Sequence, residues 1–201
     1  TVGIDEGGAL RAAVQGASAY LKVADGCRRP CAFCAIPLIK GTAVSRPLEA
    51  IVAEARALRD GGVRELCLIA QDTTDWGHDL GLKDGLATLL ETLAGAVPDI
   101  EWLRVMYAYP GYVTDRLIEV MATHRQIAHY LDIPLQHASA PVLKRMKRPT
   151  GRGNLLGMVE RIRERVPGVA IRTSFIVGFP GETGEDFERL LEFVEAGQFD
   201  N

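Results

Sequence analysis

The chain has 201 residues, of which 47% are hydrophobic and 24% are charged, and its formal net charge is -3. This composition excludes a disordered chain, and the negative charge excludes tight nonspecific nucleic-acid binding, which needs a basic domain. The N-terminus lacks the basic start of a signal peptide and no stretch reaches about 18 uninterrupted apolar residues, so we expect a soluble, cytoplasmic protein with no membrane partner.

Short apolar runs alternate along the chain with segments of helical spacing. The predicted strands cover residues 20–24, 66–70, 102–106, 130–133 and 170–177, and the predicted helices cover residues 48–58, 86–93, 113–121, 155–166 and 187–194. This regular alternation indicates an α/β fold whose parallel strands are joined by right-handed crossovers. The periodicity leaves two arrangements open, a closed barrel and an open, doubly wound sheet.

The two ends of the chain suggest a piece of a longer polypeptide. Residues 1–19 are rich in glycine and alanine, and we expect them to be a linker from an N-terminal domain that the chain lacks. The chain stops after the last predicted helix, where a sixth strand should begin. We therefore expect residues 20–201 to be a core domain truncated before its sixth strand.

Three of the four cysteines lie within eight residues, immediately after the first predicted strand. Cys27, Cys31 and Cys34 form a C-x3-C-x2-C motif, and in a parallel α/β fold the loop after a strand lies at the functional end. Thiolates are soft ligands for iron-sulfur clusters or zinc, and three of them leave one iron of a cubane cluster open to a small molecule. The alternative is a nonenzymatic zinc-binding module with Cys67 or a histidine as fourth ligand. Because Cys67 lies in an apolar run, we expect it to be a buried hydrophobic residue instead.

This motif, with the aromatic Phe33 before its last cysteine, resembles the signature of the radical S-adenosylmethionine (SAM) superfamily. The resemblance implies a partial (β/α)6 TIM-like barrel in which Cys27, Cys31 and Cys34 hold a [4Fe-4S] cluster. It also implies that SAM chelates the open iron through its amino and carboxylate groups. One electron from the cluster would cleave SAM to methionine and a 5'-deoxyadenosyl radical.

Longer stretches resemble the methylthiotransferase family within that superfamily. They read Tyr20-Leu21-Lys22-Val23, Gln71-Asp72-Thr73-Thr74, Tyr107-Ala108-Tyr109-Pro110, Asp132-Ile133-Pro134-Leu135-Gln136-His137-Ala138-Ser139 and Val177-Gly178-Phe179-Pro180-Gly181-Glu182-Thr183. The stretches 71–74, 107–110 and 132–139 are similar to the RimO branch, and this resemblance implies β-methylthiolation of an aspartate on ribosomal protein S-twelve. The same resemblance implies a second [4Fe-4S] cluster in the absent N-terminal domain and an electron donor such as a flavodoxin or ferredoxin. A transfer-RNA adenosine methylthiotransferase is the alternative.

The polar residues that follow the later strands are the candidate SAM contacts. By resemblance, Gln71 and Asp72 face the amino group of SAM, Gln136, His137 and Ser139 face its ribose, and Gly178 lies near its adenine. Each of these could instead serve a turn or a helix cap. Arg172 interrupts an apolar strand and should pair with the SAM carboxylate or a structural acid. The basic run of Lys144, Arg145, Lys147, Arg148 and Arg152 is interpreted as solvated surface and left out of the site.

Overall fold

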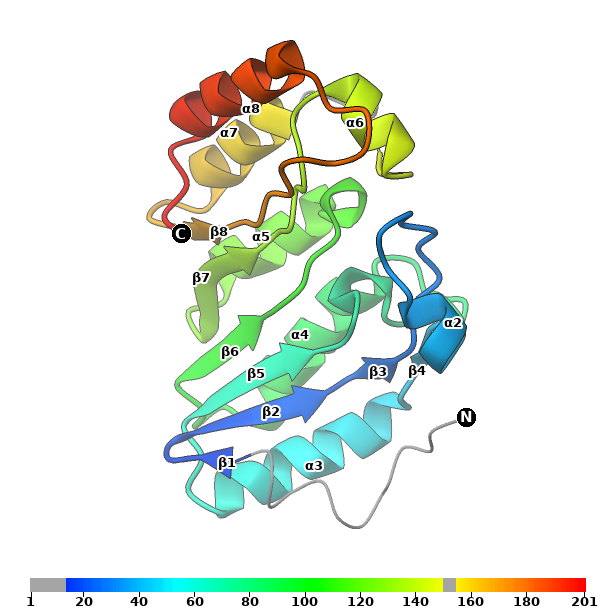
Figure 1. The fold of residues 1–201 in the computed structure, drawn as a ribbon. Coiled ribbons are helices and arrows are strands. Elements are labelled where there is room, and N and C mark those ends of the chain that lie inside the picture. The colour runs from blue at the N-terminus through cyan, green and yellow to red at the C-terminus, as the bar shows by residue number, and fades with distance from the viewer. Residues whose placement is uncertain (1–13, 150–154) are drawn as a thin grey trace.

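The computed structural model describes residues 14–149 and 155–201, and Figure 1 shows a curved sheet at its centre. The sheet has the strand order β1-β2-β5-β6-β7-β8. Its strands are β1 (Val14–Gln15), β2 (Ser18–Lys22), β5 (Glu65–Ile69), β6 (Trp102–Val105), β7 (Ile127–Asp132) and β8 (Ala170–Arg172). Within this sheet β2, β5, β6, β7 and β8 run parallel to one another, and β1 pairs antiparallel with β2 at the edge. The predicted α/β class with parallel strands is confirmed.

Helices follow the strands around one side of the sheet, and Figure 1 shows α4 and α5 behind the strands. The longer helices are α3 (Leu48–Asp60), α4 (Gly85–Ala96), α5 (Asp115–Thr123), α7 (Leu155–Arg165) and α8 (Gly184–Gly197), and each contacts the next. The shorter elements are α2 (Ile36–Lys40), α6 (Ala140–Arg145), the 3-10 turns η1 (Thr73–Asp75) and η2 (Pro110–Tyr112), and the two-stranded β3 (Ala24–Asp25) and β4 (Val44–Ser45). This arrangement is an open arc of β/α units, as a partial barrel requires.

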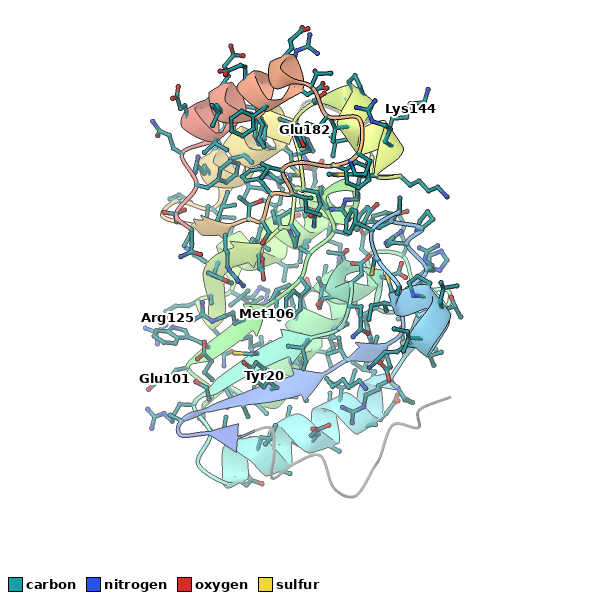
Figure 2. All side chains as sticks on the ribbon, viewed as in Figure 1. Tyr20, Glu101, Met106, Arg125, Lys144 and Glu182 are labelled. Carbon is teal, nitrogen blue, oxygen red and sulfur yellow. The ribbon has the colours of Figure 1, made fainter. Side chains whose placement is uncertain are left out.

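The apolar core lies between the sheet and its helices. In β5 the buried residues alternate, so that Leu66 and Leu68 are fully buried within the core cluster while Glu65, Cys67 and Ile69 are only partly covered. Cys67 is therefore partly covered rather than buried as its apolar run predicted. It lies opposite Arg104 in the β5–β6 pairing, on the face of the sheet that carries the polar side chains. Figure 2 shows all described side chains, including Tyr20 on β2 and Met106 just after β6.

The first and last predicted strands differ in their bounds from those of the structure. The first strand begins at Ser18 rather than residue 20, and the short β1 also falls within the segment predicted to be a linker; residues 1–13 lie outside the described residues. The last strand ends at Arg172, because residues beyond it leave the ladder and only Phe175 forms an isolated bridge, to Gln136. No helix within the described ranges is both long and apolar enough to span a bilayer.

Candidate functional site

The loop that carries the cysteines begins at a glycine that no other residue could replace without a shift of the backbone. Gly26 has φ +74°, and a Cβ built on it would lie 2.2 Å from the carbonyl oxygen of Thr42. The next residue anchors the loop, because the Cys27 amide donates to the Gly41 carbonyl at 3.1 Å. Only a residue without a Cβ permits this close approach, which starts the cysteine loop at the carboxyl end of β3.

The three cysteines of the motif line one cavity of about 180 Å³. All three are free thiols, and their exposure rises along the loop from the buried Cys27 through the half-buried Cys31 to the exposed Cys34. Burial raises the pKa of the Cys27 thiol. Within the part of the chain that the structure describes, no three His, Cys, Asp or Glu side chains are already gathered around a single metal position.

The shared cavity and the chemistry of three soft donors fit an iron-sulfur cluster. Binding would have to draw the thiols to a common centre. The loop is held at Cys31 and just after it, since the Ala32 amide donates to the Met146 carbonyl at 3.0 Å and the Cys34 amide donates to the Cys31 carbonyl at 3.1 Å. Cys27, Cys31 and Cys34 are therefore the residues that would hold such a cluster.

Two arginines of the cysteine loop are paired with two aspartates that follow β5. The Arg29 Nε donates to Asp72 Oδ2 at 2.6 Å and its Nη2 to Asp75 Oδ1 at 3.1 Å, while Arg28 Nε donates to both Asp75 oxygens at 2.8 Å. The Arg29 guanidinium also lies 3.8 Å from the ring centre of Tyr112. This network, which we call the Arg29–Asp72 cluster, fixes the cysteine loop to the end of β5.

The Arg29–Asp72 cluster changes the interpretation of Asp72. One of its carboxylate oxygens accepts from Arg29 and the other accepts from the hydroxyl of Thr74 at 2.5 Å, so both oxygens are engaged. Asp72 lines the cavity, but it is already bonded within the protein. Its role as a contact of the SAM amino group stays a prediction.

Several other candidate residues line the same cavity. They are Phe33, Gln71 and Gln136, together with Tyr107 and Tyr109. Gln136 has φ +73°, a left-handed conformation that is unusual for glutamine, and two backbone hydrogen bonds hold it there. Its amide donates to the Ser174 carbonyl at 2.9 Å, and its carbonyl accepts from Ile176 at 2.8 Å. The structure thus brings Phe33, Gln71, Asp72 and Gln136 together with the three cysteines.

His137 and Ser139 do not line this cavity. Both are buried where α6 and α8 pack together. His137 Nδ1 accepts from the Ser139 amide at 2.9 Å, and its Nε2 lies 3.5 Å from Glu182 Oε1. The Ser139 hydroxyl donates to Asp186, which forms the capping box of α8 with Thr183. The hydrogen bond from Ser139, with those from Thr183, lowers the pKa of Asp186 to about 2. These contacts support a packing role, and the ribose contact stays a prediction for both residues.

Arg172 and Gly178 also lie outside the cavity lining. Arg172 Nη1 donates to Asp132 Oδ2 at 3.1 Å, so the arginine that interrupts the last strand is paired with an acid from β7. Burial raises the pKa of the Asp132 carboxyl, and Arg172 opposes that shift. Gly178 has φ +72°, and a Cβ built on it would meet no described atom within 4 Å. Open space beside its backbone is compatible with the predicted approach of a ligand.

Arg148 lines the cavity although its place in the basic run predicted solvated surface, and Arg29 is a second lining residue that was not predicted. Lys144, Arg145 and Lys147 are exposed, as predicted for the basic run, but Arg148 is 9% exposed and lines the cavity with the cysteines. The chain turns inward at Lys147, whose φ is +54°, and the Arg148 amide then donates to the Leu143 carbonyl at 2.9 Å. A left-handed lysine has no signal in the sequence, so the run gave no reason to separate Arg148 from its neighbours. Arg152 lies outside the described residues.

The chain is similar in sequence to proteins of known family. The profile of the radical SAM superfamily matches residues 21–194. The "Ribosomal protein uS12 methylthiotransferase RimO" of Solibacter usitatus is 56% identical over 184 residues, which are 91% of this chain and 40% of that protein. The protein of the same name from Chloroflexus aurantiacus is 52% identical over 191 residues, 95% of this chain and 42% of that protein. The chain therefore spans about two fifths of the length of these relatives.

Solved structures share the fold at low sequence identity. The radical S-adenosylmethionine methyltransferase TsrM from Kitasatospora setae superposes with a TM-score of 0.72 and 19% identity, covering 92% of this chain and 34% of that one. Coproporphyrinogen III oxidase (HemN) from Escherichia coli superposes with a TM-score of 0.64 and 15% identity, covering 90% of this chain and 42% of that one. At such identities these structures support the fold alone.

Proposed function

The chain belongs to the radical SAM superfamily, and from this premise we propose that it is the radical SAM core of a methylthiotransferase that modifies ribosomal protein uS12. The observation that carries the proposal is the cavity at the carboxyl edge of the parallel strands, which three free thiols of the C-x3-C-x2-C motif line together. The names of the relatives that are about half identical over nearly the whole chain supply the substrate.

In this proposal Cys27, Cys31 and Cys34 ligate three irons of a [4Fe-4S] cluster and leave the fourth iron open for the amino and carboxylate groups of SAM. The bound cluster supplies the electron that cleaves SAM to methionine and a 5'-deoxyadenosyl radical. The protein contributes position and exclusion of water rather than acid–base chemistry, because an unactivated C–H bond cannot be ionised by ordinary side chains. No residue of the chain is assigned a catalytic role.

We assign SAM to the same cavity on the basis of its lining. Phe33, Gln71 and Gln136 are free to contact it there, since their side chains border the cavity beside the cysteines. We propose that Asp72 contacts SAM from the position in which its hydrogen bond with Arg29 holds it. His137 and Ser139 hold the loop that carries Gln136. Arg172 and Gly178 lie outside the cavity lining but at the ends of later strands, where parallel α/β folds bind their ligands, so we propose that they contact the parts of SAM that extend beyond the cavity.

The proposed reaction is β-methylthiolation of an aspartate. The 5'-deoxyadenosyl radical would take one hydrogen atom from the β-carbon and leave as 5'-deoxyadenosine. The carbon radical would then bond to a sulfide that a second SAM has methylated, and the one electron released in this step would pass to the second [4Fe-4S] cluster of the parent protein. We further propose that the longer parent protein is cytoplasmic, carries a second [4Fe-4S] cluster in an N-terminal domain, and takes its electron from a flavodoxin or ferredoxin. On this proposal β1 and β2 belong to the radical SAM core with the later strands, so the linker to that domain is shorter than the predicted residues 1–19.

The test is anaerobic reconstitution of the chain with iron and sulfide, followed by addition of a strong reductant and SAM. We expect about four irons per chain and formation of 5'-deoxyadenosine, both lost in Cys31→Ala and both kept in the matched control Cys67→Ala. Colourless protein that binds zinc and no iron would refute the proposal. Mass spectrometry of uS12 and of transfer RNA from a strain that lacks the parent gene then tests the substrate: an unmodified aspartate supports it, and a modification lost only from transfer RNA contradicts it.

A further inference from the structure

Arg148 reaches the cysteine cavity from the end of α6, which is far from the cysteine loop in the sequence. Its Nη1 lies 3.7 Å from the Sγ of Cys31, within hydrogen-bonding distance for sulfur, and its Nη2 donates to the Pro134 carbonyl at 2.5 Å. The guanidinium carbon lies 4.1 Å from the ring centre of Tyr109. The carbonyl and the ring therefore aim the guanidinium at one thiol of the motif.

Arg148 has no acidic partner in the part of the chain that the structure describes. Within residues 14–149 and 155–201 the Nε of Arg148 has no hydrogen-bond partner, and no carboxylate lies within 4.0 Å of its guanidinium. A buried arginine without a counterion is costly to stability unless an anion completes its surroundings. The three thiols that line the same cavity would become that anion when they ligate iron, since a cluster held by thiolates carries negative charge.

We propose that Arg148 is a positioning residue for the iron-sulfur cluster, which donates a hydrogen bond to the sulfur of Cys31 and raises the reduction potential of the cluster. The inference rests on the proposed function, because it requires the cluster. Its physical basis is that the reduced cluster carries one more negative charge than the oxidised cluster. A fixed cation and an N–H···S hydrogen bond stabilise the reduced state more, and hydrogen bonds to the sulfurs are among the factors that set cluster potentials.

The test compares Arg148→Met and Arg148→Lys with the wild-type chain after anaerobic reconstitution. Lys144→Met is the matched control, because Figure 2 shows Lys144 on the outer side of α6 and its side chain is exposed. The readouts are iron per chain and the midpoint potential of the cluster, measured by a redox titration followed by electron paramagnetic resonance.

We expect Arg148→Met to shift the midpoint potential of the cluster by ~59 mV in the negative direction. This shift corresponds to a change of about tenfold in the equilibrium constant for one-electron reduction of the cluster. Arg148→Lys should show a smaller shift in the same direction, because it keeps the charge but loses the planar fork. Lys144→Met should match the wild type. If Arg148→Met does not fold or does not bind iron, the shift of Arg148→Lys decides the question.

Two results would overturn the inference while leaving the proposed function intact. The first is a fully loaded Arg148 variant with the wild-type potential. The second is an unchanged potential with weaker binding of SAM, which would assign the guanidinium to the carboxylate of SAM instead. A wild-type chain that binds no iron would refute the proposed function itself, so the two failures are distinguishable.

Discussion

The two arginines that flank the cysteine cavity have opposite surroundings. Arg29, from the cysteine loop, is buried against Asp72 and Asp75, and both of its acidic partners are themselves buried. Arg148, from the end of α6, is similarly buried, but among the described residues it contacts a carbonyl, a thiol and an aromatic ring and no carboxylate. Both guanidinium groups lie over Tyr109, at 4.6 and 4.1 Å from its ring centre. On one side of the site the buried arginine is thus paired with acids of the chain. On the other side the buried arginine has no acidic partner among the described residues, and an anionic ligand would supply one.

The largest expected effect comes from replacing the arginine that is fully paired. Arg29→Met leaves the buried Asp72 carboxylate without its cationic partner and leaves Asp75 with Arg28 alone, and breaking a buried pair in this way costs about 3–5 kcal/mol. Arg148→Met removes a buried charge that has no counterion, so in the cluster-free chain we expect a change of at most ~1 kcal/mol in either direction. Urea denaturation of both variants without iron measures the difference. Equal losses of unfolding free energy would show that the two sides of the site do not differ as described.

A pair of glycine substitutions separates backbone strain from crowding at the site. Gly26 and Gly178 have nearly the same φ, +74° and +72°, but only Gly26 has backbone atoms where a Cβ would lie. Gly178→Ala should therefore cost only the left-handed conformation, about 1–2 kcal/mol. Gly26→Ala should cost a further ~1–3 kcal/mol for overpacking against Thr42 and should also lower the iron bound per chain. Thermal denaturation and iron analysis check both expectations, and similar losses in the two variants would contradict the role given to the close approach at Gly26.

The parts of the fold that follow from periodic patterns were predictable from the sequence. The alternation of apolar runs and helical spacing gave the parallel sheet, and the position of Cys27, Cys31 and Cys34 after the first strand placed them on a shared cavity wall. Contacts between segments far apart in the chain were not predictable. The hydrogen bond between Arg29 and Asp72 is such a contact, because nothing in the sequence pairs these two residues. The contact of Asp72 with SAM, which the resemblance implies, stays a prediction.

Local conformations that break the usual residue preferences were also missed. The inward turn that buries Arg148 includes a left-handed lysine, Lys147. The strand β8 ends at Arg172, and beyond it Phe175 forms an isolated bridge to Gln136. Neither feature has a periodic pattern. Tertiary packing decides both, and a single sequence does not contain that information in a form that propensities can detect.

The smallest expected effect tests how firmly the loop that carries Gln136 is tied to α8, and it appears only in acid. Asp186 accepts from Ser139 and Thr183, and because these bonds favour the carboxylate, its folded pKa is about 2 against an ordinary value of 3.8. A lowered pKa stabilises the fold above the unfolded value, and that contribution is lost as the pH falls from about 4 to about 2. We expect Asp186→Asn to be less stable than the wild type near pH 6 and to approach it near pH 2, as measured by urea denaturation across this range. Glu188→Gln, on the exposed side of the same helix, should follow the wild-type profile throughout. If Asp186→Asn is destabilised equally at both ends of the range, the hydrogen bond from Ser139 stabilises the fold through its geometry rather than through the charge of Asp186. The α6 side of the site would then depend less on charge than the Arg29–Asp72 cluster does.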